Sequence, residues 1–175
     1  MLAVILLLAA QSAAPPQLAP PPPACATPQH RQLDFWVGSW DVYATGTDRL
    51  VARSLIERRY DGCAIRENWM PLRGQGGGSF SAWRPGKARW RQTWVDSSGT
   101  WVEFTGGMDG NAMVLTGTWA GSGANGRDGI VRMRYSPAPN GAVRQHGQVS
   151  TDNGATWTDS FDFTYRPAAG ARPPG

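Results

Sequence analysis

The chain has 175 residues and a formal net charge of +4, with 17 basic and 13 acidic residues. Lys87 is the only lysine, and the arginines are scattered along the chain without forming a stripe or a block, which argues against a nucleic-acid-binding protein. The length that remains after the N-terminal segment suits one domain with a sizeable core.

The N-terminal segment has the pattern of an export signal followed by a linker. Residues 2–10, LAVILLLAA, form an apolar run that is too short to span a bilayer, and small residues follow it. This pattern predicts a signal peptide over residues 1–13. The proline-rich residues 14–32 predict an extended tether. We therefore expect a periplasmic or secreted protein with no membrane span in the mature chain.

Two cysteines, Cys25 and Cys63, stand 38 positions apart. In an oxidising compartment such a pair is expected to form one disulfide, which here would join the tether to a hairpin. Two unpaired thiols are the alternative.

Short stretches rich in Trp, Val, Thr, Phe and Tyr follow from Leu33, separated by Gly, Asp, Asn and Ser about every ten residues. This spacing is typical of an antiparallel sandwich or up-and-down barrel. We predict an all-β, antiparallel up-and-down barrel of about ten strands over residues 33–167, with a disordered tail over 168–175. The expected strands are approximately 35–45, 50–60, 63–70, 78–84, 88–95, 100–108, 112–120, 129–136, 142–151 and 155–166.

Three turns predict which side chains point into the barrel, because loop length fixes the register of a hairpin. Asp61-Gly62 is expected to form a two-residue loop, and 97–99 and 152–154 are expected to form three-residue loops. The pairs predicted for the first two hairpins are Ile56 with Glu67, Ser54 with Trp69, Trp94 with Val102, Gln92 with Phe104, and Trp90 with Gly106. Those predicted for the third are Val149 with Trp157, Gly147 with Asp159, Gln145 with Phe161, and Val143 with Phe163.

These registers predict an aromatic lining with a few polar groups in it. The aromatic positions are Trp36, Trp40, Trp69, Trp90, Trp94, Trp119, Trp157, Phe104, Phe161 and Phe163; the polar ones are Glu67, Gln92, Gln145 and Asp159. About eight strands already make a barrel that side chains can just fill, so ten favour a cavity. Polar groups that converge in an apolar cup are typical of a small-molecule site. We predict a small, partly apolar ligand, bound by Trp40, Glu67, Trp69, Gln92, Trp94, Gln145 and Asp159.

Two other functions stay open. Glu67 or Asp159 could serve as the acid/base of a small-molecule enzyme. A packed, ligand-free barrel with a satisfied polar network is the second. The only histidines are His30 and His146, and the predicted register turns His146 outward. With no Cys/His cluster and no GxSxG elbow, we expect neither a metal nor a cofactor.

Residues 150–157, STDNGATW, resemble the Asp-box S-x-D-x-G-x-T-W found on hairpins of sialidase-type propellers. In that motif these residues stabilise the turn and are not catalytic. The chain is too short for the blades of a propeller and has one copy, so we interpret the motif as a hairpin device.

Four segments resemble an uncharacterised family of exported bacterial proteins: Phe35–Val42, Gly62–Trp69, Trp94–Gly99 and Arg144–Trp157. The resemblance covers nearly the whole domain and implies a fold more than a function. Gly38-Ser39-Trp40 is also similar to the G-x-W of the calycins (lipocalins and relatives), in which the tryptophan closes one end of the barrel. The nitrobindin-like barrel, with about ten strands, is the nearest functional analogue and binds haem through a histidine. Haem is therefore a further alternative, for which His146 would be the ligand.

Overall fold

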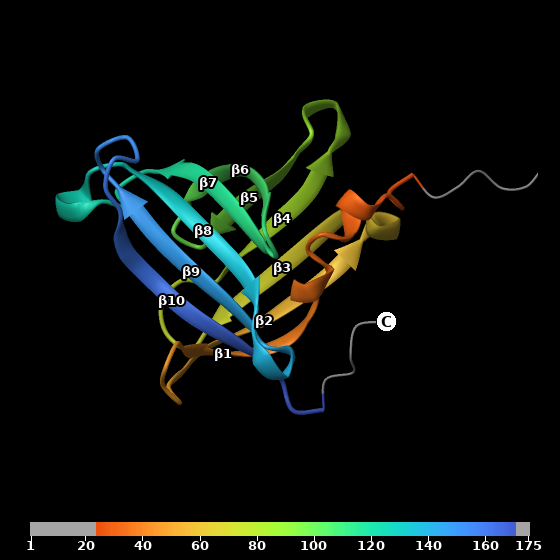
Figure 1. Cartoon of the computed structure of the whole chain (residues 1–175). Helices are drawn as coiled ribbons and strands as arrows, with labels where there is room; N and C mark the ends of the chain where they lie inside the picture. Colours follow the sequence, from red (N-terminus) through yellow and green to blue (C-terminus); the bar gives the residue numbers. More distant parts are fainter. Residues whose placement is uncertain (1–23, 171–175) are drawn as a thin grey trace, which may run out of the picture.

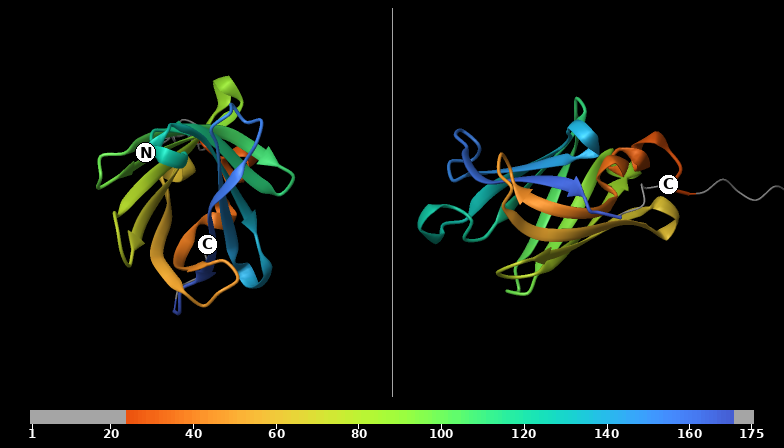
Figure 2. Two further views of the ribbon diagram at one scale, coloured as in Figure 1. Left: turned by 90° about the vertical axis from the view of Figure 1, so that its left-hand side faces the viewer. Right: turned by 90° about the horizontal axis from the view of Figure 1, so that it is seen from below.

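Ten antiparallel strands close into a barrel in the computed structural model, which describes residues 24–170 (Figure 1). Each strand pairs with its neighbours in the sequence, and β1 also pairs with β10, so that the strands form a ring (Figure 2, left). This confirms the all-β, calycin-like up-and-down barrel. The strands are β1 (Gly38–Ala44), β2 (Leu50–Arg59), β3 (Ala64–Pro71), β4 (Gly77–Arg84), β5 (Arg89–Asp96), β6 (Trp101–Asp109), β7 (Ala112–Trp119), β8 (Gly129–Pro137), β9 (Val143–Ser150) and β10 (Thr158–Pro167).

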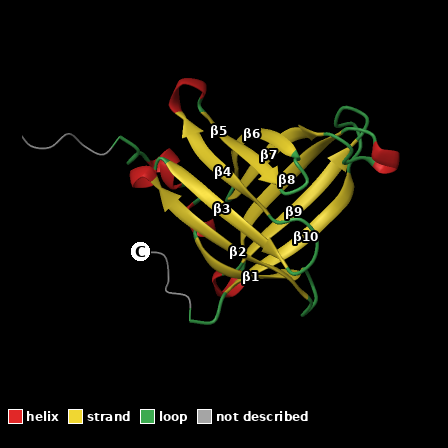
Figure 3. Ribbon diagram, turned by 180° about the vertical axis from the view of Figure 1, so that it is seen from behind, coloured by secondary structure: helices red, strands yellow, loops and turns green. Residues whose placement is uncertain are grey.

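Short 3₁₀ helices precede or connect the strands (Figure 3). They are Pro28–Arg31, Asp34–Trp36, Tyr60–Gly62, Pro85–Lys87, Ala124–Gly126 and Pro139–Gly141. Among residues 24–170, no helix is both long enough and apolar enough to cross a membrane.

The two hairpins with the simplest turns have the predicted registers. Asp61 and Gly62 have φ of 54° and 88°, the left-handed pair that a two-residue hairpin loop needs, and Ile56 lies opposite Glu67. The second hairpin closes with Gly99 at φ 85°, and Gln92 lies opposite Phe104. Turn chemistry therefore placed both Glu67 and Gln92 correctly inside the barrel.

The register predicted for β9 and β10 is wrong. Val149 pairs with Thr158 instead of Trp157, because the loop is longer than three residues. A bulge between Asp159 and Phe161 then shifts the pairing by one more residue. Since each one-residue shift turns a strand over, Asp159 faces outward, while Phe161 beyond the bulge returns to the inside.

The Asp-box accounts for the longer loop. The Ser150 hydroxyl donates to the Asp152 carboxylate at 2.7 Å and accepts from the Gly154 amide at 2.8 Å. Asp152 also accepts from the backbone amide and the hydroxyl of Thr156, at 2.9 and 2.6 Å. Trp157, expected inside the barrel, lies under the guanidinium of Arg132 at 4.0 Å from its ring centroid. The motif acts as a hairpin device, as the sequence indicated.

The segment before β1 covers one end of the barrel. It is the orange segment at the right of Figure 1, at the end opposite the 120–128 and 151–157 loops. Trp36, expected in the opening strand, instead lies in a 3₁₀ turn and is fully buried. Trp40, in β1, is also buried and donates its indole N–H to the Trp36 carbonyl at 2.9 Å. Because β1 begins two residues after Trp36, this tryptophan lies outside the strand and its side chain fills the end of the barrel.

Part of the sequence predicted as tether is folded onto the same end. His30 is only 5% exposed, and its Nδ1 lies 2.8 Å from the Thr27 hydroxyl. The Trp90 indole N–H donates to the Gln32 side chain at 2.9 Å, and Arg58 pairs with Asp34 at 2.6 Å. The signal peptide predicted over 1–13, residues 14–23 of the predicted tether, and residues 171–175 of the predicted tail lie outside the described residues.

The Cys25–Cys63 disulfide is confirmed and fastens this segment to the β2–β3 turn, with a Cα–Cα distance of 4.9 Å. Beside it, Arg31 donates to the Cys25 carbonyl at 2.7 Å. The Arg31 guanidinium also lies so close to Gly62 that a Cβ there would approach it to 2.4 Å. The left-handed backbone therefore favours glycine at position 62, and a larger residue would also displace the Arg31 guanidinium.

Replacing both Cys25 and Cys63 with serine should lower the free energy of unfolding by about 3–4 kcal/mol, because the disulfide closes a loop of 38 positions. Urea unfolding followed by tryptophan emission measures the loss. Wild-type protein treated with a reductant is the matched control and should reach the same stability. Equal free energies of unfolding for the oxidised and reduced protein would contradict a stabilising Cys25–Cys63 disulfide.

Candidate functional site

The barrel interior contains a cavity of about 260 Å³. Its lining is mainly aromatic, with three polar side chains from β3, β5 and β9. The lining residues are Glu67, Trp69, Gln92, Trp94, Phe104, Trp119, Met133, Tyr135, Gln145, Phe161, Phe163 and Tyr165.

The cavity is deepest toward the N-terminal segment and shallowest near the opposite loops. Gln92 and Tyr135 are each 1% exposed. By contrast, Trp69, Trp94 and Phe161, which lie near strand ends on the loop side, are only partly buried. A ligand would therefore enter past these three aromatic side chains.

Trp36 supports the floor of the cavity from below. Its ring centroid lies 4.7 Å from that of Tyr135 and 6.2 Å from that of Tyr165, and both tyrosines line the cavity. Trp36 belongs to the segment before β1, which the disulfide fastens to the barrel. This segment and the floor of the cavity therefore pack together as one unit.

One wall is a continuous set of aromatic rings. Phe161 stacks on Phe163 with centroids 5.3 Å apart, and Phe163 packs on Trp69 at 5.6 Å. Phe161 lies directly over Gly147, where a Cβ would approach the ring to 2.3 Å. The glycine in β9 thus gives Phe161 room to lie flat against the sheet.

Among the lining residues that the structure describes, Glu67 is the only carboxylate, and it is 5% exposed. The Ser79 hydroxyl donates to one carboxylate oxygen at 2.9 Å, and the Ser54 hydroxyl donates to the other at 3.4 Å. Burial raises the pKa of Glu67 to about 7, although the hydrogen bonds from Ser79 and Ser54 oppose the rise. Glu67 can therefore change its protonation state near neutral pH.

Two glutamines and two tyrosines form a hydrogen-bonded network around the rest of the floor. The Tyr165 hydroxyl donates to the Gln145 oxygen at 2.6 Å, and the Gln145 amide donates to the Tyr135 oxygen at 3.1 Å. The Gln92 amide donates to Ser81 at 3.0 Å. Burial raises the pKa of both tyrosines far above 10, and the nearby Glu67 adds to the shift. Both phenols therefore keep their protons at neutral pH.

The structure brings together five of the seven residues predicted to bind a ligand: Glu67, Trp69, Gln92, Trp94 and Gln145. Trp40 is buried beside Trp36 and Tyr165 instead of lining the cavity. Three lining residues were not predicted to point inward: Met133, Tyr135 and Tyr165. The alternation of apolar residues along 131–135 could have identified the first two, and Tyr165 follows Phe163 at the spacing of one strand face.

Asp159 lies on the outer surface and does not form a carboxylate pair with Glu67. Its side chain is 73% exposed and accepts from Gln148 at 3.1 Å. His146 Nε2 lies 2.9 Å from the same carboxylate, which confirms that His146 faces outward. The longer loop, which shifts the register by one residue before the bulge, is the physical reason that Asp159 is outside.

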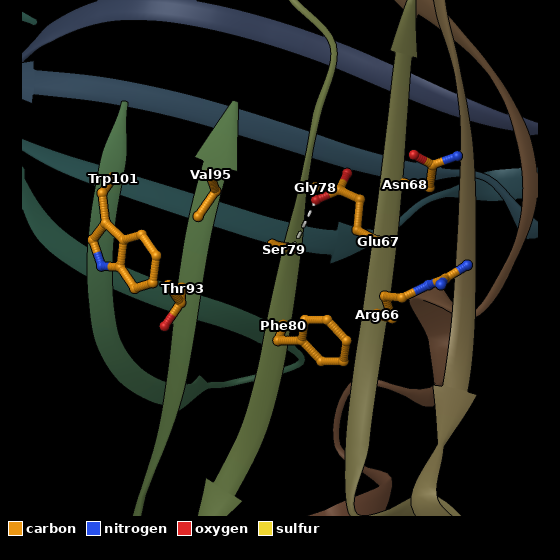
Figure 4. Close-up of a pocket in the computed structure, with 9 residues that line it drawn as sticks. All are labelled: Arg66, Glu67, Asn68, Gly78, Ser79, Phe80, Thr93, Val95 and Trp101. Carbon is orange, nitrogen blue, oxygen red and sulfur yellow. Dashed lines mark hydrogen bonds between the residues drawn. The ribbon is translucent and has the colours of Figure 1, made fainter. Parts of the chain in front are cut away.

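A second, open depression of about 530 Å³ lies on the outer face of β3 to β6 (Figure 4). Arg66, Phe80, Val95 and Trp101 are among its lining residues. Glu67 also belongs to the lining, yet its carboxylate is bonded to Ser79 and faces the barrel interior. The depression is larger than the cavity, but none of its lining residues in the described part of the chain directs a buried polar side chain toward it, so the interior is the better candidate site.

Within residues 24–170, no group of three or more His, Cys, Asp or Glu side chains is arranged to hold a metal ion. Comparison of the chain with protein-family models and with curated proteins gave no match.

Glu67 should make the folded protein less stable as the pH rises from 4.5 to about 7. In this window the folded protein binds more protons than the unfolded chain, whose carboxyl has the ordinary pKa of 4.5. The free energy of unfolding should fall by on the order of 3 kcal/mol across the window and be unaffected by Glu67 below it.

Urea unfolding of the wild type and Glu67→Gln between pH 4 and pH 8 measures this contribution as the difference between the two curves. Carboxylates with lowered pKa, such as Asp152 and Asp162, are present in both proteins and cancel. Parallel curves would show that Glu67 does not titrate in this window.

Proposed function

We propose that this protein binds a small, partly apolar molecule inside the barrel. The observation that carries the proposal is the cavity of about 260 Å³, walled by aromatic rings and floored by hydrogen-bonded polar groups. It exceeds the roughly 150 Å³ of apolar cavities that take up benzene. The rings would supply contact area, and Glu67, Gln92 and Gln145 would orient the ligand.

The proposal includes export to the periplasm or the exterior of the cell. The Cys25–Cys63 disulfide supports it, because disulfides persist in oxidising compartments. Membership of the uncharacterised exported family, and a relationship to calycins beyond the shared architecture, belong to the same proposal.

An acid/base enzyme is the second candidate, and the pKa of Glu67 near 7 is the observation that favours it. Asp159, the other candidate acid/base, lies outside the barrel and cannot act with Glu67. The remaining ionisable groups of the lining are two phenols that keep their protons, which leaves Glu67 without a partner acid or base. Binding without turnover is therefore the better-supported function.

The haem and ligand-free alternatives fit the geometry less well. Neither histidine lines the cavity: His30 contacts Thr27 in the N-terminal segment, and His146 contacts Asp159 outside. The residues present therefore do not offer the histidine ligand of a nitrobindin-type haem site. A ligand-free structural barrel would be expected to pack its interior, whereas this one retains the cavity.

Titration with tert-butylbenzene, a compact apolar probe, tests the proposal. Saturable binding should change the emission of Trp69, Trp94 and Trp119, which line the cavity. Phe161→Ala should weaken binding about tenfold by removing part of the aromatic wall.

Phe80→Ala is the matched control, because Phe80 is 46% exposed and lines only the outer depression. Its affinity should equal that of the wild type. Binding that is lost in Phe80→Ala and kept in Phe161→Ala would move the site to the outer face, and no saturable binding would overturn the proposal.

A further inference from the structure

We propose that the cavity selects an organic cation: a small ammonium compound with apolar substituents, held by Glu67 and the surrounding aromatic rings. This inference rests on the proposed function, since it names the chemical class of the ligand for the same cavity.

The charges of the lining favour a cation over an anion. Its ionisable side chains are Glu67, Tyr135 and Tyr165, all of which are neutral or negative, and none of the twelve lining residues identified in the described chain is Lys, Arg or His. An anionic ligand would thus enter a desolvated space without a counter-charge, beside a carboxyl group. A cation would instead meet the one group that can become negative there.

The hydrogen bonds of the floor lead to the same preference. The Tyr165 hydroxyl donates its only proton to Gln145 at 2.6 Å. The Tyr135 hydroxyl is directed at two acceptors, the Gln92 oxygen and the Met133 sulfur, each at 3.5 Å. The Tyr165 proton is therefore not free for a ligand that needs donors, and the Tyr135 proton already has acceptors within the protein. Glu67 by contrast is an acceptor when ionised, and a carboxylate has about four lone-pair sites. Ser54 and Ser79 occupy two of these sites and hold the group in place.

The aromatic rings would stabilise the same charge. Eight of the twelve lining side chains are aromatic: Trp69, Trp94, Phe104, Trp119, Tyr135, Phe161, Phe163 and Tyr165. The face of an aromatic ring carries partial negative charge and attracts cations, most strongly where water is excluded. An ammonium group with methyl or other alkyl substituents can contact rings on several sides, whereas a strongly hydrated ion would lose its water without replacement.

The size of the cavity limits the ligand to a compact molecule. A volume of about 260 Å³ corresponds to roughly nine water molecules at about 30 Å³ each. A quaternary ammonium with a single aromatic or short aliphatic substituent fits this space, and a long acyl chain or a tetrapyrrole does not.

Three probes of similar shape and different charge test the inference. They are phenyltrimethylammonium, its neutral isostere tert-butylbenzene, and the anion 2-methyl-2-phenylpropanoate, each titrated by calorimetry at pH 8. We expect the cation to bind about tenfold more tightly than the neutral isostere and the anion to bind most weakly. If the neutral probe binds as tightly as the cation or more tightly, the choice of ligand class is wrong while the binding function stands. If none of the three binds, both are wrong.

Glu67→Gln keeps the shape of the side chain and removes its charge. It should weaken the cation about tenfold and change the neutral isostere by less than about twofold. Asp159→Asn, on the outer surface, is the matched control and should leave both affinities unchanged. An equal loss for cation and neutral probe in Glu67→Gln would mean that the residue only shapes the cavity.

Wild-type protein provides a test that needs no substitution. Phenyltrimethylammonium has no titratable proton, so a pH dependence of its binding reports on the protein. The groups facing Glu67 are Ser54 and Ser79 from the neighbouring strands and the phenols Tyr135 and Tyr165, none of which titrates near neutrality. Affinity for the cation should therefore rise about tenfold from pH 6 to pH 8 with ionisation of Glu67. A flat profile would contradict the ion pair.

Discussion

The width of a ten-stranded barrel is the constraint on which the rest of the structure depends, because its inward side chains cannot fill it unaided. The chain meets this constraint differently at the two ends. At one end the segment before β1 packs Leu33 and Trp36 into the opening, and the Cys25–Cys63 disulfide fastens it. At the other end no comparable segment of the described chain enters, and the space remains as the cavity. Closure of one end of the barrel therefore gives the cavity its floor, and the other end, which stays open, is its entrance.

Burial of a single carboxyl group gives this cavity its chemical character. Glu67 loses most of its contact with water but keeps hydrogen bonds from Ser54 and Ser79; burial outweighs these bonds and raises the pKa of Glu67 to about 7. A Gln in its place would be cheaper to bury, as Gln92 and Gln145 illustrate on the same floor. Retaining an acid at this position lowers the free energy of unfolding near neutral pH. The proposed recognition of a cation would give the acid a function.

Turn chemistry predicted the parts of the site that depend on short-range rules. Asp61-Gly62 and Gly99 fixed the faces of Glu67 and Gln92, and alternation then placed Trp69 and Trp94. The wrong predictions arose where an irregular backbone changed the register between two paired strands. The Asp-box lengthened one loop and a bulge followed it, so Asp159 was predicted on the wrong face although Phe161 was not. Trp36 was predicted inside the barrel and is buried there, but its 3₁₀ turn was predicted as strand. A 3₁₀ turn and a strand can share the same aromatic pattern, and only packing against Tyr135 and Tyr165 decides between them.

A crystal structure of the protein with phenyltrimethylammonium tests the central claim most directly, because it locates the charge relative to Glu67 and the aromatic wall. The account predicts one bound cation inside the barrel, with its ammonium group against the Glu67 carboxylate and its methyl groups on the faces of Trp69, Trp94 or Phe163. An interior closed by repacked side chains, or a cation bound only in the outer depression beside Phe80 and Trp101, would contradict it.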